Sequence, residues 1–303
     1  MPDAPRTSPD RPFGTVLTAM VTPFDHDGRL DPVAAAKLAA HLVDHGHDGL
    51  VVSGTTGESP TTSDAEKVQL LRAVLEAVGD RAQVLAGVGT NDTAHTVQAA
   101  RQAEAAGAHG LLVVTPYYSK PPQSGLLAHF TTVAEATGLP VMVYDIPGRS
   151  AVRLARETLL RLAGHERIRA VKDATGDLVA GSELIASSGL AYYSGDDALN
   201  LGWLAHGAAG VVSVVGHLAG ERYAAMAAAV DAGDLAEARR LHLSLLPAVR
   251  AVMAPRSQGA VMVKAALHAA GLLPTRRTRL PLPEATDDEV RDLVAALAEA
   301  GLR

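Results

Sequence analysis

Residues 110–172 read GLLVVTPYYSKPPQSGLLAHFTTVAEATGLPVMVYDIPGRSAVRLARETLLRLAGHERIRAVK, and their pattern indicates the fold class. Three short apolar runs alternate here with two segments of helical periodicity: Gly110–Thr115, Gly125–Thr137, Pro140–Tyr144, Ala155–Ala163 and Ile168–Lys172. Runs that are apolar almost throughout are typical of strands buried on both faces, which occur in parallel sheets covered by helices. The stretch therefore predicts consecutive strand–helix units of a parallel sheet.

The same alternation extends in both directions along the chain. Further apolar runs occur at Thr15–Thr22, Gly49–Ser53, Gln83–Val88, Ala191–Ser194 and Gly210–Val215. Eight strand–helix units are the number that closes a (β/α)8 barrel. A doubly wound dinucleotide-binding sheet would carry a glycine-rich fingerprint after its first strand, where residues 21–24 read VTPF instead. We therefore predict an α/β fold, a (β/α)8 TIM barrel with a C-terminal helical extension.

Capping signals support the helices between these runs. Asp31 precedes Pro32 at the start of one helical pattern, and Ser63 stands three residues before Glu66 at the start of the next. The first pair combines an N-cap residue with proline at the first helical position, and the second has the spacing of a capping box. Both positions therefore predict helix starts.

The pattern divides the chain into three regions. Residues 13–230 are expected to form the barrel. Residues 231–303 are expected to form a helical domain packed on it, because no Gly- or Ser-rich linker separates the two. Residues 1–12 are polar and Pro-rich without the apolar core of a signal peptide, so we expect a disordered tail. No uncharged apolar run reaches the ~18 residues of a membrane span, which favours a cytoplasmic protein without membrane contact.

Composition excludes several classes of function. The chain has 303 residues, a net charge of −6 and no cysteine. The acidic balance argues against a surface that binds nucleic acid. Without cysteine, disulfides, cysteine-ligated zinc, iron–sulfur clusters and a thiol nucleophile are excluded. His41, His45 and His47 lie close together but lack an accompanying carboxylate motif, so we expect ordinary surface-helix residues and no metal site.

Polar residues gather where the predicted strands end, which is where barrels of this type place their catalytic groups. These segments are Ser53–Glu58, Thr115–Tyr118, Tyr144–Arg149, Lys172–Asp173 and Ser194–Asp197. The Gly54–Gly57 segment offers N–H groups and two hydroxyls that suit a carboxylate, and a plain turn would have the same composition. Tyr144 can relay protons or fill the core, and Arg149 can bind a carboxylate or lie on the surface.

Lys172 is the most informative of these residues. Strand alternation places Ile168, Ala170 and Lys172 on one face, which is the barrel interior in our interpretation. A lysine there loses hydration, so its pKa falls and a neutral amine becomes available to attack a carbonyl carbon. The alternative is a lysine that pairs with an acid at the strand end. Lys264, in an apolar helical segment, is a weaker second candidate.

Five motifs occur in order along the chain: GTTGES (Gly54–Ser59), VTPYY (Val114–Tyr118), VYDIPGRS (Val143–Ser150), VKDATGD (Val171–Asp177) and YSGDD (Tyr193–Asp197). Together they resemble the dihydrodipicolinate synthase family, from about Phe13 to the C-terminus. The resemblance implies a lyase that condenses pyruvate with L-aspartate 4-semialdehyde to 4-hydroxy-tetrahydrodipicolinate, in lysine and diaminopimelate biosynthesis. It implies no metal and no organic cofactor.

The resemblance also implies a role for each matching residue. Lys172 matches the Schiff-base lysine and Tyr144 the proton donor and acceptor. Thr55 and Tyr118 match the other two members of the proton relay, with Tyr118 contributed across a tight-dimer interface. The substrate-binding matches are Thr56 and the backbone at Val212 for pyruvate, and Arg149 and Gly195 for the semialdehyde. A homotetramer built as a dimer of dimers is implied as well.

Two departures from the family pattern qualify this resemblance. Feedback-inhibited relatives bind lysine through two histidines and a glutamate, where this chain has Asp64, Lys67 and His95. Lys67 places a positive charge where a lysine ligand carries its own, so we predict weak or absent lysine inhibition. Asp145 and Ser53 stand where asparagine is frequent, and we expect them to flank the site.

The nearest alternative is another pyruvate-dependent aldolase of the same superfamily, of the keto-deoxy sugar acid or N-acetylneuraminate lyase type. Such an enzyme would share Lys172 and Tyr144 and differ in its second substrate. Arg149 favours an aldehyde that bears a carboxylate over a sugar. A barrel kept only as a binding protein would have lost a catalytic residue, and none of the matching residues is lost.

Overall fold

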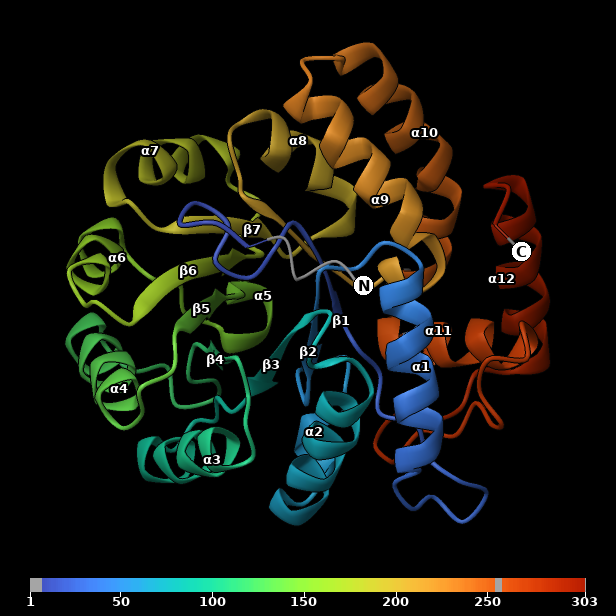
Figure 1. Cartoon of the computed structure of the whole chain (residues 1–303), viewed down its shortest axis with the longest axis horizontal. Coiled ribbons are helices and arrows are strands. Elements are labelled where there is room, and N and C mark those ends of the chain that lie inside the picture. Colours follow the sequence, from blue (N-terminus) through green and yellow to red (C-terminus); the bar gives the residue numbers. More distant parts are fainter. Residues whose placement is uncertain (1–6, 254–257, 303) are drawn as a thin grey trace.

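The structure is a computed structural model that describes residues 7–253 and 258–302. At its centre, eight parallel strands form a closed barrel in which each strand pairs with the next and β8 pairs with β1 (Figure 1). The strands are β1 (Val16–Ala19), β2 (Gly49–Val52), β3 (Gln83–Gly87), β4 (Gly110–Val114), β5 (Val141–Asp145), β6 (Ile168–Asp173), β7 (Ala191–Ser194) and β8 (Gly210–Ser213). The predicted (β/α)8 TIM barrel with a C-terminal helical extension is confirmed.

Helices follow the strands and surround the barrel (Figure 1). They are α1 (Pro32–Asp44), α2 (Asp64–Val78), α3 (Thr93–Ala105), α4 (Gln123–Glu135), α5 (Pro147–Ser150), α6 (Arg156–Ala163), α7 (Leu178–Ser188), α8 (Asn200–Ala205) and α9 (Gly216–Asp231). The predicted starts of α1 and α2 are confirmed. Asp31 accepts a hydrogen bond from the Ala34 N–H, and Ser63 and Glu66 form a reciprocal capping box.

Side chains of the strands divide between two hydrophobic clusters, because successive residues point to opposite faces. The inner cluster fills the barrel and includes Leu17, Val51, Leu85, Met142 and Ala170. The outer cluster lies between the strands and the helices. Within β6, Ala170 belongs to the inner cluster, so Lys172, two residues further on, also points into the barrel.

The C-terminal helices are α10 (Leu235–Val252), α11 (Gly259–Ala269) and α12 (Asp287–Glu299). They pack on α9 and on one another at one side of the barrel (Figure 1). Their buried side chains, among them Leu245, Val263 and Leu293, belong to the same cluster as the outer face of the strands. Residues 270–286 join α11 to α12 without forming a helix or strand.

Residues 1–6 of the expected tail lie outside the described residues. Residues 8–11 form a turn in which Ser8 and Arg11 exchange backbone hydrogen bonds. The Arg11 guanidinium donates two hydrogen bonds, of 2.7 and 2.8 Å, to Asp231 at the end of α9. This part of the tail is therefore attached to the barrel by an ion pair between residues far apart in sequence.

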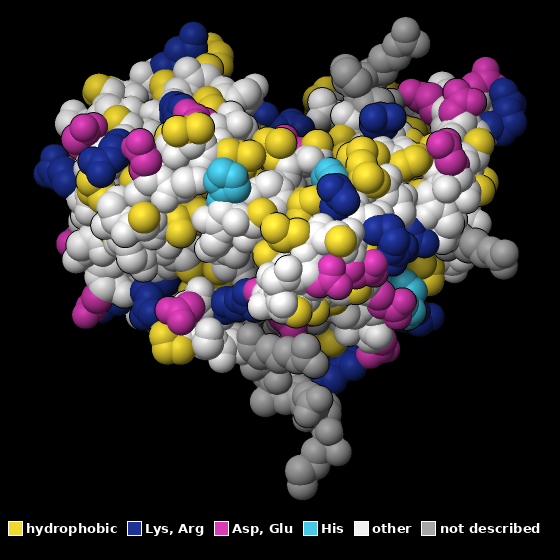
Figure 2. All heavy atoms as spheres, turned by 90° about the horizontal axis from the view of Figure 1, so that it is seen from above, with side chains coloured by type: hydrophobic (Ala, Val, Ile, Leu, Met, Phe, Trp, Pro, Cys, Tyr) yellow, Lys and Arg dark blue, Asp and Glu magenta, His cyan; other side chains and the backbone are white. Residues whose placement is uncertain are grey.

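Charges of both signs are mixed on the face of the molecule that is seen from above. Figure 2 shows one face on which basic and acidic side chains alternate with hydrophobic ones. Among the described residues, no helix combines the length and the apolarity that a membrane crossing requires.

Candidate active site

A pocket of about 310 Å³ opens at the C-terminal ends of β2 to β5. Four of the predicted site residues line it: Thr55, Tyr118, Tyr144 and Arg149. A second pocket of about 230 Å³ shares Thr55 and Arg149 with the first and also reaches Thr56. The structure therefore brings residues from three separate motifs to one end of the barrel.

Lys172 lies beneath this region, inside the barrel. Its side chain is buried, with 4% exposed, and its Nζ lies 4.2 Å from the centroid of the Tyr144 ring. β5 and β6 place the two residues side by side in register. Within the described part of the chain, no carboxylate lies within ion-pairing distance of Nζ, so the strand-end ion pair considered as an alternative is not formed there.

Burial lowers the pKa of Lys172 from 10.5 to about 8, because the dry interior disfavours the ammonium form. The negative charge of Asp197 opposes this shift, and the positive charge of Arg149 adds to it. A lysine with this pKa carries a large neutral fraction at mildly alkaline pH. It can therefore attack a carbonyl carbon as a free amine.

Tyr144 is affected by the same burial in the opposite sense. Burial raises the pKa of its phenol well above the usual 10, because the phenolate is the charged form, and Arg149 only partly opposes this. The strand around it is held by Thr115, whose N–H and hydroxyl both donate to the Tyr144 carbonyl oxygen at 2.9 Å. The Tyr144 ring is thus fixed beside the amine, and its hydroxyl keeps its proton.

Gly195 leaves space for the Lys172 side chain. A Cβ atom at this position would lie 3.1 Å from Lys172 Cε and 3.1 Å from the carbonyl oxygen of Asp173. Any larger residue would therefore press on the methylene next to the amine. Val212, another predicted site residue, is buried in the inner cluster on β8, so its backbone forms part of the barrel wall.

The turn that carries Thr55 and Thr56 has an unusual backbone. Ser53 and Glu58, at its two ends, adopt φ angles of 56° and 55°, in the left-handed region. Inside the turn, the Glu58 N–H donates to the Thr55 carbonyl oxygen at 3.1 Å. Thr55 is exposed to the pocket, whereas Thr56 is buried. The two neighbouring hydroxyls therefore face different surroundings.

Arg149 lies on the one-turn helix α5, directly after β5. Its guanidinium donates to Gln258 Oε1 at 3.0 Å, which links the pocket to the C-terminal extension. Gln258 was not among the residues predicted from the sequence. No sequence signal could have found it, because the contact spans 109 residues.

Tyr118 differs from the other site residues in its exposure. It has φ of 71°, and its side chain is 88% exposed at the rim of the pocket. A large aromatic ring in this position leaves most of its surface without contacts in the single chain.

Asp197 is a second residue whose part in the site was not predicted from the sequence. It is buried, and its Oδ2 accepts hydrogen bonds from the N–H groups of Val214 and Val215 at 2.9 and 3.0 Å. Its charge is the strongest that opposes the lowered pKa of Lys172. The Asp-Asp pair after β7 was visible in the sequence, but not which of the two carboxylates turns inward.

The two departures Asp145 and Ser53 occupy different places. Ser53 lines the larger pocket. Asp145 follows the inward-facing Tyr144, so its side chain points to the helix layer, where it accepts from the Leu154 N–H at 3.2 Å. Burial raises its pKa to about 7. Asp145 therefore does not contact the pocket directly, because strand alternation turns it away.

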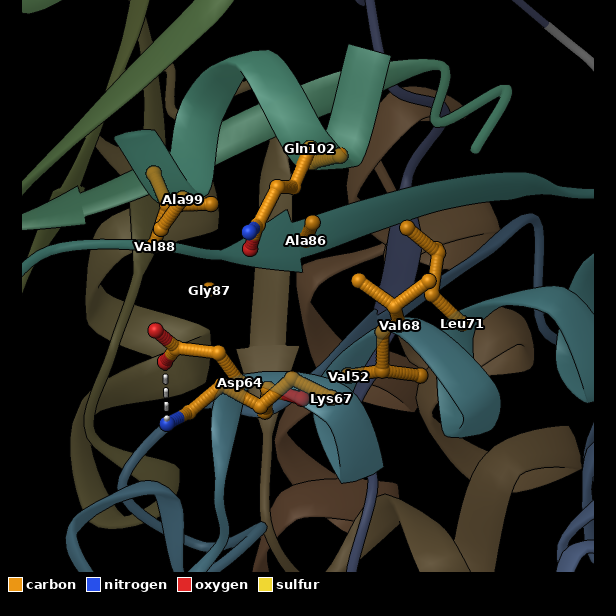
Figure 3. Close-up of a pocket in the computed structure, with 12 residues that line it drawn as sticks. Val52, Asp64, Lys67, Val68, Leu71, Ala86, Gly87, Val88, Ala99 and Gln102 are labelled. Carbon is orange, nitrogen blue, oxygen red and sulfur yellow. Dashed lines mark ion pairs between the residues drawn. The ribbon is translucent and has the colours of Figure 1, made fainter. Parts of the chain in front are cut away.

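The three residues at the position of the family's lysine site lie together. Figure 3 shows Asp64 and Lys67 beside one another at a small cavity between β3 and the helices around it. Lys67 Nζ lies 3.7 Å from Asp64 Oδ1, and His95 Nε2 lies 2.9 Å from Asp64 Oδ2. The acidic group of the cluster is thus already engaged by two basic side chains of the same chain.

The three histidines that were considered as metal ligands make other contacts. The His41 and His45 rings contact each other with centroids 4.1 Å apart and planes tilted by 34°. His47 is buried, with Nε2 2.6 Å from Thr18 Oγ1. His47 is therefore a core residue and not a surface residue, which corrects our expectation. Among the described residues, no three His, Asp or Glu side chains form a group that could hold a metal ion.

Comparisons with known proteins agree with the motifs. Residues 12–300 match the model of the dihydrodipicolinate synthetase family. A Kineococcus radiotolerans protein named 4-hydroxy-tetrahydrodipicolinate synthase is 67% identical over 302 residues, which cover 100% of this chain and 98% of that protein.

Two solved structures are also similar. The dihydrodipicolinate synthase of Cyanidioschyzon merolae with lysine bound is 40% identical, with a TM-score of 0.92 over 96% of this chain and 99% of that one. The chloride-inhibited enzyme of Acinetobacter baumannii, complexed with pyruvate, is 34% identical, with a TM-score of 0.91 over 96% and 99%.

Proposed function

Because the chain belongs to the dihydrodipicolinate synthetase family, we propose that the pocket at the strand ends is the active site of the family's reaction. The chain is a lyase that condenses pyruvate with L-aspartate 4-semialdehyde to 4-hydroxy-tetrahydrodipicolinate. The observation that carries the assignment of the site is the buried Lys172, whose Nζ lies 4.2 Å from the centroid of the Tyr144 ring.

The first half of the reaction uses Lys172 as a nucleophile. Its neutral amine attacks the keto carbon of pyruvate, and the carbinolamine loses water to give a protonated imine. The imine withdraws electrons from the neighbouring methyl group, which gives up a proton and becomes the nucleophilic carbon of an enamine. Tyr144 is placed to supply the proton that leaves with water, and Thr55 and Tyr118 extend the relay to the pocket.

The second half forms the carbon–carbon bond. The enamine carbon attacks the aldehyde carbon of L-aspartate 4-semialdehyde, and the aldehyde oxygen takes up a proton. The amine of the same substrate then attacks the imine carbon and displaces Lys172, which closes the ring and frees the enzyme. Arg149, oriented by Gln258, is placed to bind the carboxylate of the semialdehyde. Thr56 and the backbone at Val212 bind pyruvate, and Gly195 keeps the pocket open.

We further propose that the active form is a homotetramer built as a dimer of dimers. The support is Tyr118, which is 88% exposed in the single chain although it lines the rim of the pocket. A second copy that covers this ring would give the relay its third member. Mixing an inactive Lys172→Ala protein with an inactive Tyr118→Ala protein should restore part of the activity. No recovery in the mixed oligomer would contradict the shared site.

We propose that lysine inhibits this enzyme weakly or not at all. Lys67 and His95 both occupy the Asp64 carboxylate, which leaves it poorly placed to bind the ammonium of a lysine ligand. Titration of the activity with L-lysine tests this proposal, and strong inhibition at sub-millimolar lysine would refute it. The cytoplasmic location expected from the sequence remains part of the proposal.

Trapping with borohydride tests the central assignment. The protein is incubated with pyruvate, reduced with borohydride and digested, and the adduct is located by mass spectrometry. An adduct on Lys172 supports the assignment, and its absence refutes it, with Lys172→Arg as the control. Turnover of aspartate semialdehyde compared with keto-deoxy sugar acids then tests the preference that Arg149 is expected to give.

A further inference from the structure

Lys264, the second lysine that the sequence indicated, forms an ion pair with Glu58 on the turn that carries Thr55 and Thr56. Both side chains are 1% exposed. Lys264 Nζ also donates to the Arg277 carbonyl oxygen at 2.8 Å and lies 4.0 Å from the centroid of the Phe24 ring. These contacts hold the ammonium in place, so Lys264 connects parts of the fold and does not act as a nucleophile.

The second carboxylate oxygen of Glu58 is bound by the same part of the chain. The backbone N–H of Arg279 donates to it at 2.8 Å. The Arg279 guanidinium donates to both oxygens of Glu66, at 2.6 and 3.0 Å, and to the Thr61 carbonyl oxygen at 2.8 Å. The C-terminal extension therefore binds the turn at Glu58 and the start of α2 at Glu66, the two residues that flank the segment 59–65.

The backbone conformation of Glu58 explains why these contacts are needed. Its φ of 55° is a left-handed conformation that costs energy for a residue with a side chain, and it persists only where surrounding contacts hold it. The Glu58 N–H bonds to the Thr55 carbonyl oxygen at 3.1 Å, so the conformation of Glu58 is coupled to the position of the threonines.

We propose that Lys264 and Arg279 are positioning residues that hold the Thr55–Thr56 turn in its reactive geometry. Lys264 acts through Glu58, and the Arg279 guanidinium acts through Thr61 and Glu66 on the far side of the same segment. The proposal rests on the proposed function, because the threonines have a catalytic part only in that reaction. In this proposal, residues of the C-terminal extension help to position catalytic residues that belong to the barrel. A displacement of about 1 Å at a reacting group can lower a rate on the order of 100-fold, so even a small movement of this turn should be measurable.

Three variants test the proposal, and each is analysed on the full-length oligomer. Lys264→Met removes the cation but leaves Glu58 buried without it, which endangers folding. The double variant Glu58→Gln with Lys264→Met removes both charges and avoids that penalty. Arg279→Gln keeps the buried pair and removes only the contacts of the guanidinium. Arg276→Gln is the matched control, since Arg276 lies in the same loop but pairs with the exposed Asp287 at 2.7 Å.

The measurements are kcat, the KM for pyruvate, the rate of the borohydride-trapped adduct and the melting temperature. We expect the folded variants to form the Lys172 adduct but to lose about 10- to 100-fold in kcat/KM, with a raised KM for pyruvate. We also expect the double variant to recover stability but not the kinetics, and Arg276→Gln to behave like the unmodified protein.

Unchanged kcat and KM in the folded double variant and in Arg279→Gln would overturn the proposal, even if their melting temperatures fall. That result differs from failure of the proposed function. In that case the unmodified protein itself would form no adduct on Lys172.

Discussion

Lys172 is expected to become reactive near pH 8. With a pKa of about 8, half of the amine is neutral at pH 8, whereas an ordinary lysine with a pKa of 10.5 would be about 0.3% neutral. Burial therefore raises the amount of attacking amine about 150-fold at this pH. Since a base with a lowered pKa loses its proton at lower pH, the rate of imine formation should rise about 50-fold from pH 6 to pH 8 and then level off.

The assay follows the first chemical step alone. Enzyme and saturating pyruvate are mixed at each pH and then transferred into borohydride at one fixed pH after defined times, and the adduct is measured by intact mass. The carboxylate of pyruvate stays ionised throughout, so the pH dependence reports on the enzyme. Lys172→Arg serves as the blank, because it should give no adduct.

The substitution Asp197→Asn should shift the pKa of Lys172 in a predictable direction. The negative charge of Asp197 raises the pKa of Lys172, so its removal should move the rising limb of the profile to lower pH. Asparagine keeps one oxygen to accept from the Val214 and Val215 N–H groups, whereas its amide nitrogen cannot accept from Asn200 as Oδ1 does. The melting temperature of the variant is therefore measured alongside the profile. An inflection above pH 10 in the unmodified protein, or a shift to higher pH in the variant, would refute the reasoning.

Three further changes follow from the site. Tyr144→Phe should lower kcat by about 100-fold or more, because a positioned proton donor contributes on the order of 10²- to 10⁴-fold, and loss of less than tenfold would contradict its role. Gly195→Ala should crowd Lys172 Cε, which lies 3.1 Å from the new Cβ, and slow adduct formation with only a modest fall in melting temperature. Lys172→Met should stabilise the fold at pH 7. The pKa of Lys172 is lowered from 10.5 in the unfolded chain to about 8 in the folded protein, so the buried ammonium destabilises the fold. This destabilisation is complete below pH 8 and disappears above pH 10.5. Its removal should therefore raise the free energy of unfolding by about 3 kcal/mol at most. Urea unfolding at pH 7 and pH 10 should show that gain shrinking, and a less stable variant at pH 7 would contradict it.

The strands and many helix starts could be predicted from the sequence, because their signals are local. The capping box of Ser63 and Glu66 needs only four consecutive residues. The inward direction of Lys172 follows from alternation within one strand. The pairing of Lys264 with Glu58 could not be predicted, since its members lie 206 residues apart and meet only after the extension packs on the barrel. The same distance in sequence hides the contact of Arg149 with Gln258.

One physical cause prepares both reacting groups at the site. Desolvation disfavours whichever form of a group is charged, so it lowers the pKa of the Lys172 ammonium and raises that of the Tyr144 phenol. Near pH 8 this leaves a large fraction of neutral amine next to a phenol that still carries its proton. Imine formation needs this pair, because the amine attacks the carbonyl carbon while the departing oxygen must be protonated. A more hydrated site would reverse both shifts together, so any substitution that admits water beside Lys172 should weaken the nucleophile and make the phenol easier to ionise in one step.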